Sequence, residues 1–178
     1  MADRHPISLT VNGVTHDRAV APRQHLVDFV RQQLGLKGSH LGCEHGVCGA
    51  CTVEVDGQIV RGCLTLAVQA QGCRVRTIEG LSADGDVADL QDAFVRHNAL
   101  QCGFCTPGMV MAAKELLETR PDASREEVRQ WISGNYCRCT GYHAIVDAIC
   151  DTLASRAAAR GAAGTPAPST TAWARRRP

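Results

Sequence analysis

The stretch Cys43-Glu44-His45-Gly46-Val47-Cys48-Gly49-Ala50-Cys51 holds three cysteines on one short segment, and Cys63 follows it after eleven further residues. The glycines in this stretch tolerate positive φ, so the backbone can curl closely around a bound group. The C-x4-C-x2-C…C spacing is typical of plant-type [2Fe–2S] sites. The stretch therefore predicts a loop wrapped around a [2Fe–2S] cluster, with Cys43, Cys48, Cys51 and Cys63 as its ligands.

Three alternatives to this first site stay open from the residues alone. A structural zinc site with four cysteines usually has two short cysteine pairs and a long gap, which this pattern lacks. Cys73 competes with Cys63 as the fourth ligand, although the chain must cross a further segment to reach it. A Rieske-type cluster would need two histidines in place of two cysteines, and His40 and His45 flank or enter the loop.

A second group of cysteines lies in the other half of the chain. The segment from Gln101 to Gly108 contains a C-x2-C pair, and the segment from Asn135 to Tyr142 contains a C-x-C pair. Each segment lies between two predicted helices, so a helical bundle can bring both turns to one end. Zinc stays an alternative for this set alone, and a thioredoxin-like interpretation lacks the βαβ context that it needs. Beside the first set, the favoured prediction is a second [2Fe–2S] cluster on Cys102, Cys105, Cys137 and Cys139.

The residues around the first cysteine set predict a small α+β domain. Alternating apolar residues and the two-residue turns Asn12-Gly13 and Asp56-Gly57 indicate β-hairpins. A helical pattern follows Pro22 and ends near Gly35. The expected strands are residues 7–11, 14–20, 52–55, 58–63 and 74–78.

The second half of the chain is predicted to be a helical bundle after a linker over residues 79–87. Pro107 fits the start of a helix, and Ser124 and Glu127 form a capping box. The expected helices are centred on residues 90–95, 107–120, 124–132 and 142–153. The predicted organisation is a cluster-binding α+β domain over residues 1–80, a helical cluster-binding domain over 81–156 and a flexible tail over 157–178.

Composition excludes several classes of function. The net charge is +1 and no long basic run interrupts the part predicted to fold, so neither nucleic acid nor an anionic membrane is indicated as a partner. The apolar stretches are too short for a membrane span, and the first residues lack the apolar segment of a signal peptide. A cytoplasmic location is therefore expected. In a reducing compartment ten cysteines are metal ligands or redox groups rather than a disulfide framework. Cys73 and Cys150 remain outside both sets and are interpreted as buried structural thiols.

With both sets and their flanks in view, the chain resembles the small iron–sulfur subunit of the molybdenum hydroxylases, the group that includes xanthine dehydrogenase, aldehyde oxidoreductase and aerobic carbon monoxide dehydrogenase. The resemblance covers about residues 7–153. Two positions depart from the family pattern, Tyr136 in place of a common aliphatic residue and His143 in place of a common Gln, and neither is a ligand position. The motifs that carry the resemblance are Gly42 to Val53, Cys63 to Gln69, Gln101 to Gly108 and Cys137 to Tyr142.

The resemblance implies a plant-type ferredoxin-like β-grasp domain followed by a four-helix bundle, each with one [2Fe–2S] cluster. It implies that the helical-domain cluster lies nearest the molybdenum–pterin cofactor and the other cluster lies towards FAD. Gln101 is similar to a residue that hydrogen-bonds the pterin, and Cys139 matches a cysteine close to it. The implied partners are a large molybdenum-binding subunit and a medium FAD-binding subunit, assembled as a dimer of heterotrimers.

The expected function is therefore electron transfer between a molybdenum cofactor and FAD in partner subunits, with no catalysis by this chain alone. A free-standing two-cluster ferredoxin and a zinc-stabilised interaction module are the alternatives. No residue of the chain identifies the substrate, because substrate specificity would lie in the large subunit.

Overall fold

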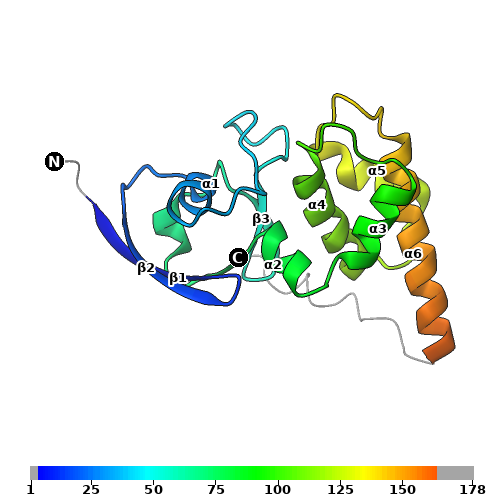
Figure 1. Ribbon diagram of the computed structural model, residues 1–178, viewed down its shortest axis with the longest axis horizontal. Helices are drawn as coiled ribbons and strands as arrows, with labels where there is room; N and C mark the ends of the chain where they lie inside the picture. Colours follow the sequence, from blue (N-terminus) through cyan, green and yellow to red (C-terminus); the bar gives the residue numbers. More distant parts are fainter. Residues whose placement is uncertain (1–3, 164–178) are drawn as a thin grey trace.

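The computed structural model describes residues 4–163, which form a sheet-containing part and a helical part side by side along the long axis of the molecule (Figure 1). Each part has its own apolar core. The core of the sheet part is built around residues such as Leu9 and Phe29, and that of the helical part around residues such as Phe94 and Met109. The mixed sheet and the helices confirm the predicted α+β class.

One mixed sheet holds the first part together, with strand order β2-β1-β5-β3-β4. β1 and β5 pair in parallel, and the other neighbours are antiparallel. Along β1, Ile7, Leu9 and Val11 are buried in alternation with more exposed neighbours, as a half-buried strand requires. The strands are β1 (His5–Val11), β2 (Val14–Val20), β3 (Thr52–Val55), β4 (Gln58–Arg61) and β5 (Arg74–Arg76).

Both predicted two-residue turns are confirmed. Asn12 and Gly13 have φ values of 49° and 80°, and Asp56 and Gly57 have 48° and 83°. Positive φ at both central residues is the signature of a type I′ turn, whose twist matches that of the flanking strands. The predicted strands over 58–63 and 74–78 are too long, because β4 ends at Arg61 and β5 at Arg76.

The predicted helix of the first part is present, but it is not a regular α-helix. α1 (Leu26–Asp28) continues directly into a π-helical turn, η1 (Phe29–Gln33), and the chain leaves it at Gly35 with φ 75°. Its apolar residues pack into the same core as β1. A short 3-10 helix, η2 (Ala67–Ala70), lies in the segment between β4 and β5.

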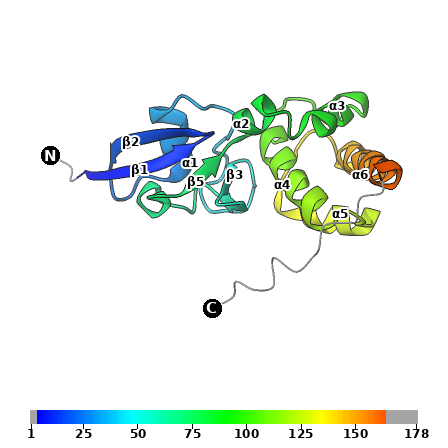
Figure 2. The ribbon, with the colours of Figure 1, turned by 90° about the horizontal axis from the view of Figure 1, so that it is seen from below.

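The helical part begins earlier than predicted: the predicted linker is wrong over residues 79–83, which lie in a helix, and only residues 84–87 form a connection. Ile78, Leu81 and Val87 are buried in the core of the helical part, so burial of these apolar side chains stabilises a helix here. The elements are α2 (Ile78–Ala83), α3 (Ala88–Arg96), α4 (Thr106–Thr119), α5 (Arg125–Trp131), the 3-10 turn η3 (Ile132–Gly134) and α6 (His143–Ala163). α4 lies between the sheet and the helices α3, α5 and α6, and it contacts β3 (Figure 2).

The signals at the starts of two helices are confirmed, and the end of α6 is a correction. Pro107 lies in the first turn of α4, and the capping box that opens α5 is complete. α6 runs to Ala163, so residues 157–163 are helical rather than a flexible tail. Alanine and arginine favour helix here, and Arg156 and Arg160 bind Asp89 and the carbonyl of Pro121. The remainder of the predicted tail lies outside the described residues.

A nearly buried ion pair connects the two parts. The Lys114 Nζ atom on α4 lies 3.1 Å from a carboxylate oxygen of Glu54 on β3 and 2.8 Å from one of Glu118. The side chains of Lys114 and Glu54 are only 9% and 12% exposed. Across residues 4–163, the helices are too short or too polar to cross a lipid bilayer.

Candidate functional site

The first cysteine loop curls back on itself, as its glycines predict. Gly46 and Gly49 have φ values of 82° and 75°. The curl brings the backbone N–H of Cys48 to 3.4 Å from the sulfur of Cys43. Leu64 covers Gly46 so closely that a Cβ at this position would collide with the leucine side chain. The loop therefore presents inward-pointing N–H groups to its own thiols.

The structure brings Cys63, and not Cys73, to the first set. Cys51 and Cys63 are buried together against Val27, and the thiols of Cys51 and Cys63 interact. The thiol of Cys48 also lies within the range of the charges of Cys43 and Cys63. Cys73 instead lies beside Asp56 at the start of β5. The four predicted ligands of the first site are thus neighbours.

The histidines of this region are directed at backbone groups. The Nδ1 atom of His45 interacts with the carbonyl of Cys43. The ring of His40 stacks on Phe104 with a centroid separation of 4.6 Å, and its Nδ1 lies 2.8 Å from the Phe104 carbonyl. Phe104 is 46% exposed. This stack connects the first loop to the turn that carries Cys102 and Cys105.

The two turns of the second set meet at one end of the helical part, as predicted. The sulfurs of Cys102 and Cys139 lie 3.7 Å apart. The thiol of Cys105, at the start of α4, interacts with that of Cys137. Cys102 and Cys139 are exposed, whereas Cys105 is buried. The set therefore reaches from the interior of the helical part to its surface.

The thiols are arranged in pairs, which suits a binuclear cluster. A tetrahedral metal with bonds of about 2.3 Å to sulfur places two of its sulfurs about 3.8 Å apart, close to the 3.7 Å between Cys102 and Cys139. Each iron of a [2Fe–2S] cluster takes two protein ligands, so two pairs are required rather than four donors around one point. Within residues 4–163, no three or more Cys, His, Asp or Glu side chains are grouped to hold a single ion.

Burial and hydrogen bonding act in opposite directions on the thiols. Burial alone would raise the pKa of the Cys43 thiol, but hydrogen bonds from the backbone N–H groups of Cys48, His45 and Val47 lower it to about 6. Burial raises the pKa of Cys51 to about 11 and that of Cys105 to about 12. Thiolates at such buried positions need a nearby positive charge, which a bound metal supplies.

Thr140 and Tyr142 organise the second set, although neither was among its predicted functional residues. Thr140 donates to the sulfur of Cys137 from its backbone N–H at 3.4 Å and from its hydroxyl at 3.1 Å. The Tyr142 hydroxyl accepts a hydrogen bond from the backbone N–H of Cys137 at 3.0 Å. Gly141 and Tyr142 have φ values of 66° and 71°, so the loop turns back on itself through two left-handed residues. The Thr-Gly pair directly after the C-x-C pair was the available signal for this turn.

Hydrogen bonds join the two cysteine loops directly. The backbone N–H of Tyr136 donates to the carbonyl of Cys48 at 2.8 Å. The buried side-chain amide of Asn135 donates to the carbonyl of Gly49 at 3.2 Å. Arg61 on β4 donates to the carbonyl of Gly134 at 2.7 Å. The two sites are therefore fixed against each other by backbone groups next to their predicted ligands.

The remaining predicted residues lie at the edges of these sites. Gln101 is exposed, and its side-chain amide donates to the carbonyl of Cys139 at 3.2 Å. Cys73 and Cys150 are partly buried rather than fully buried, and Cys150 lies near Arg125 and Asp147.

Comparisons with known proteins match both halves of the chain. Residues 9–80 match a family described as 2Fe-2S iron-sulfur cluster binding domain, and residues 77–150 match one described as [2Fe-2S] binding domain. The nicotine 6-hydroxylase small subunit of Paenarthrobacter nicotinovorans is 55% identical over 150 residues, which is 84% of this chain and 90% of that protein.

Two further relatives are similarly close. Caffeine dehydrogenase subunit gamma of Pseudomonas sp. strain CBB1 is 53% identical and covers 82% of this chain and 89% of its own length. A chain of the crystal structure of quinoline 2-oxidoreductase from Pseudomonas putida 86 superposes with a TM-score of 0.82 at 53% identity. That match covers 89% of this chain and 98% of the quinoline enzyme chain.

Proposed function

The chain belongs to the family of small iron–sulfur subunits of the molybdenum hydroxylases, and on this basis we propose how its residues serve electron transfer. As such a subunit it carries two [2Fe–2S] clusters and works within a multi-subunit oxidoreductase rather than as a catalyst by itself. We assign the first cluster to Cys43, Cys48, Cys51 and Cys63, and the second to Cys102, Cys105, Cys137 and Cys139.

The observation that carries this assignment is the gathering of eight cysteines into two groups of four that hydrogen bonds join. A bound [2Fe–2S] cluster accepts or donates one electron at a time. The chain fixes the separation of the two sites through the Tyr136–Cys48 hydrogen bond. The chain also tunes the reduction potential of each proposed cluster, because Cys48 and Thr140 donate hydrogen bonds to the sulfurs of assigned ligands.

We propose that the partners are a large molybdenum-binding subunit and a medium FAD-binding subunit, assembled as a dimer of heterotrimers. The exposure of Cys102, Cys139 and Gln101 supports a partner's pterin next to the second site, with Gln101 as its hydrogen-bonding residue. At the first site Val47 and Leu64 are 41% and 60% exposed, which suits the approach of the second partner.

Three finer parts of the organisation are also proposals. A domain boundary near residue 80 agrees with the separate apolar cores of the sheet part and the helical part, although α2 spans this boundary. A four-helix bundle of α3 to α6 agrees with their shared core. A cytoplasmic location agrees with ten cysteines that are all free thiols.

A nitrogen heteroaromatic compound is the proposed substrate class of the complex. The relatives above 50% identity include proteins named for nicotine, caffeine and quinoline. Purification of the complex through this chain, followed by assays with quinoline and with a simple aldehyde, tests this proposal. Turnover of the aldehyde alone would contradict it.

The assignment of the clusters is tested by EPR spectroscopy of the dithionite-reduced chain, with iron and sulfide measured on the same sample. Two distinct signals and about four irons per chain are expected for two [2Fe–2S] clusters. Cys105→Ser should remove one signal and about half of the iron, whereas the control Cys150→Ser should keep both. A colourless chain with zinc in place of iron would contradict the assignment.

A further inference from the structure

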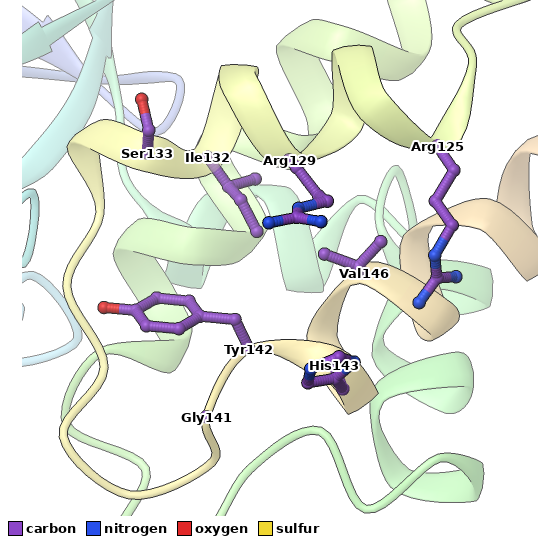
Figure 3. A pocket seen from close by; sticks show the side chains of 8 residues that line it. All are labelled: Arg125, Arg129, Ile132, Ser133, Gly141, Tyr142, His143 and Val146. Carbon is purple, nitrogen blue, oxygen red and sulfur yellow. The ribbon is translucent and has the colours of Figure 1, made fainter.

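A cavity of about 280 Å³ lies between α5, η3 and the start of α6 (Figure 3). Its floor is apolar, because Ile132 and Val146 are only 2% and 3% exposed. The ring of Tyr142 adds an aromatic wall, and the Tyr142 hydroxyl is already bound to the N–H of Cys137. The cavity therefore offers a flat ligand apolar contacts on its floor and along one wall.

The rim of this cavity is cationic. Arg125 and Arg129 lie one turn apart on α5, and His143 begins α6 opposite them (Figure 3). Arg125 is neutralised by Asp147 at 2.6 Å. Arg129 pairs with Glu126 one turn earlier, but the closest atoms are 3.9 Å apart and both side chains are 65% exposed.

We propose that this cavity binds a small carboxylate that carries a single apolar ring. The Arg129 guanidinium can donate two parallel hydrogen bonds to a carboxylate, a geometry that suits arginine better than lysine. Because its contact with Glu126 is long and exposed, the Arg129 guanidinium can exchange that contact for two short bonds to a ligand, and one guanidinium matches one negative charge. The apolar floor would strip water from part of an inorganic phosphate or sulfate without replacing its hydrogen bonds, which is costly. The cavity volume of about 280 Å³ is at the lower end of the range for ligand pockets, so the apolar part of the ligand is limited to about one ring.

Benzoate is the probe for this proposal, and the protein is the full chain with its clusters. Calorimetry or ligand-observed NMR should show benzoate binding and no binding of the neutral benzyl alcohol. Arg129→Gln should weaken benzoate binding by about tenfold or more, because it removes a charge-assisted pair. Arg120→Gln is the matched control, since Arg120 is 56% exposed and pairs with Glu127 away from the cavity.

A second variant should strengthen binding. Asp147→Asn removes the carboxylate that neutralises Arg125, so the Arg125 guanidinium becomes available on the rim and benzoate affinity should rise several-fold. Unchanged affinity in Arg129→Gln, no gain in Asp147→Asn, or equal binding of phosphate and benzoate would each overturn the proposal. Binding requires no electron transfer, so these results are independent of the proposed function, and the EPR spectrum reports whether each variant keeps its clusters.

Discussion

The backbone N–H of Tyr136 donates a hydrogen bond to the carbonyl oxygen of Cys48, with the two atoms 2.8 Å apart. Cys48 belongs to the first cysteine set, and Tyr136 directly precedes Cys137 of the second. One hydrogen bond and the covalent bonds of three residues thus connect the sulfurs of the two sites. The chain needs this connection to be short, because the two clusters must exchange electrons.

Replacing Tyr136 with proline removes the donor of this hydrogen bond. Asn135, the preceding residue, has φ −123° and ψ 113°, which is the extended conformation that a residue before proline prefers. We expect Tyr136→Pro to lower stability by about 1 kcal/mol and to slow electron exchange between the clusters. Rapid-freeze EPR after partial reduction measures the exchange. Tyr136→Phe keeps the N–H and should behave as the wild type; an equal effect in both variants would assign the role to the tyrosine hydroxyl.

Gly108 of α4 lies directly against the backbone of the first cysteine loop. A Cβ at this position would overlap the carbonyl of Gly49 and lie 3.3 Å from the Cα of Ala50. Because both neighbours are backbone, Gly108→Ala should cost on the order of 2–3 kcal/mol and separate the two parts. Thermal unfolding followed by cluster absorbance measures this loss. Gly161→Ala in α6 meets no atom within 4 Å and should instead stabilise the helix by about 0.5–1 kcal/mol. If Gly108→Ala left thermal unfolding unchanged, α4 would pack against the first cysteine loop less tightly than the structure shows.

The parts of the fold that depend on local signals were predictable from the sequence. Asn12-Gly13 specifies its turn because both residues tolerate positive φ, and Ser124 specifies a helix start because its hydroxyl accepts the N–H of Glu127. The two cysteine spacings are equally local. The cysteines of each set come together once the strands or helices beside them pack against each other. The hairpin turns and the short connections between helices ensure this packing.

Features that depend on contacts between distant residues were not predictable. The segment over residues 79–87 is rich in glycine and aspartate, and its first part forms α2 because Leu81 is buried in the core of the helical part. The hydrogen bond from Tyr136 to Cys48 joins backbone atoms of two loops, so no side-chain pattern encodes it. The cationic cavity likewise requires α5 to lie beside the start of α6.

Lys114 and Glu54 form an ion pair in which each charge stabilises the other. Since both side chains are nearly buried, Lys114→Met leaves the Glu54 carboxylate without its main partner and should cost about 3 kcal/mol. The double variant Lys114→Met with Glu54→Leu should recover much of this loss, because neither charge of the pair remains. Thermal unfolding of the four proteins in this cycle measures the coupling. Arg96→Ala breaks an exposed pair with Asp151 and should cost less than about 1 kcal/mol; a Lys114→Met cost no larger than this would contradict the buried pair.

The hydroxyl of Thr140 donates to the sulfur of Cys137 at 3.1 Å, and this contact should tune the second cluster alone. A hydrogen bond to a ligand sulfur stabilises the reduced cluster more than the oxidised one, because the reduced form carries more negative charge. Thr140→Val should therefore lower the midpoint potential of the second cluster by tens of millivolts, which corresponds to roughly 1 kcal/mol for one electron.

A redox titration followed by EPR reads the potentials of both clusters in one sample. Thr140→Ser keeps the donor and should keep the potential near that of the wild type. Thr119→Val removes a hydroxyl that is bound to the carbonyl of Glu115 on α4 and serves as a control away from both sites. Equal shifts in the valine and serine variants at position 140, or a shift of the first cluster as large as that of the second, would show that the hydroxyl does not act through the sulfur of Cys137.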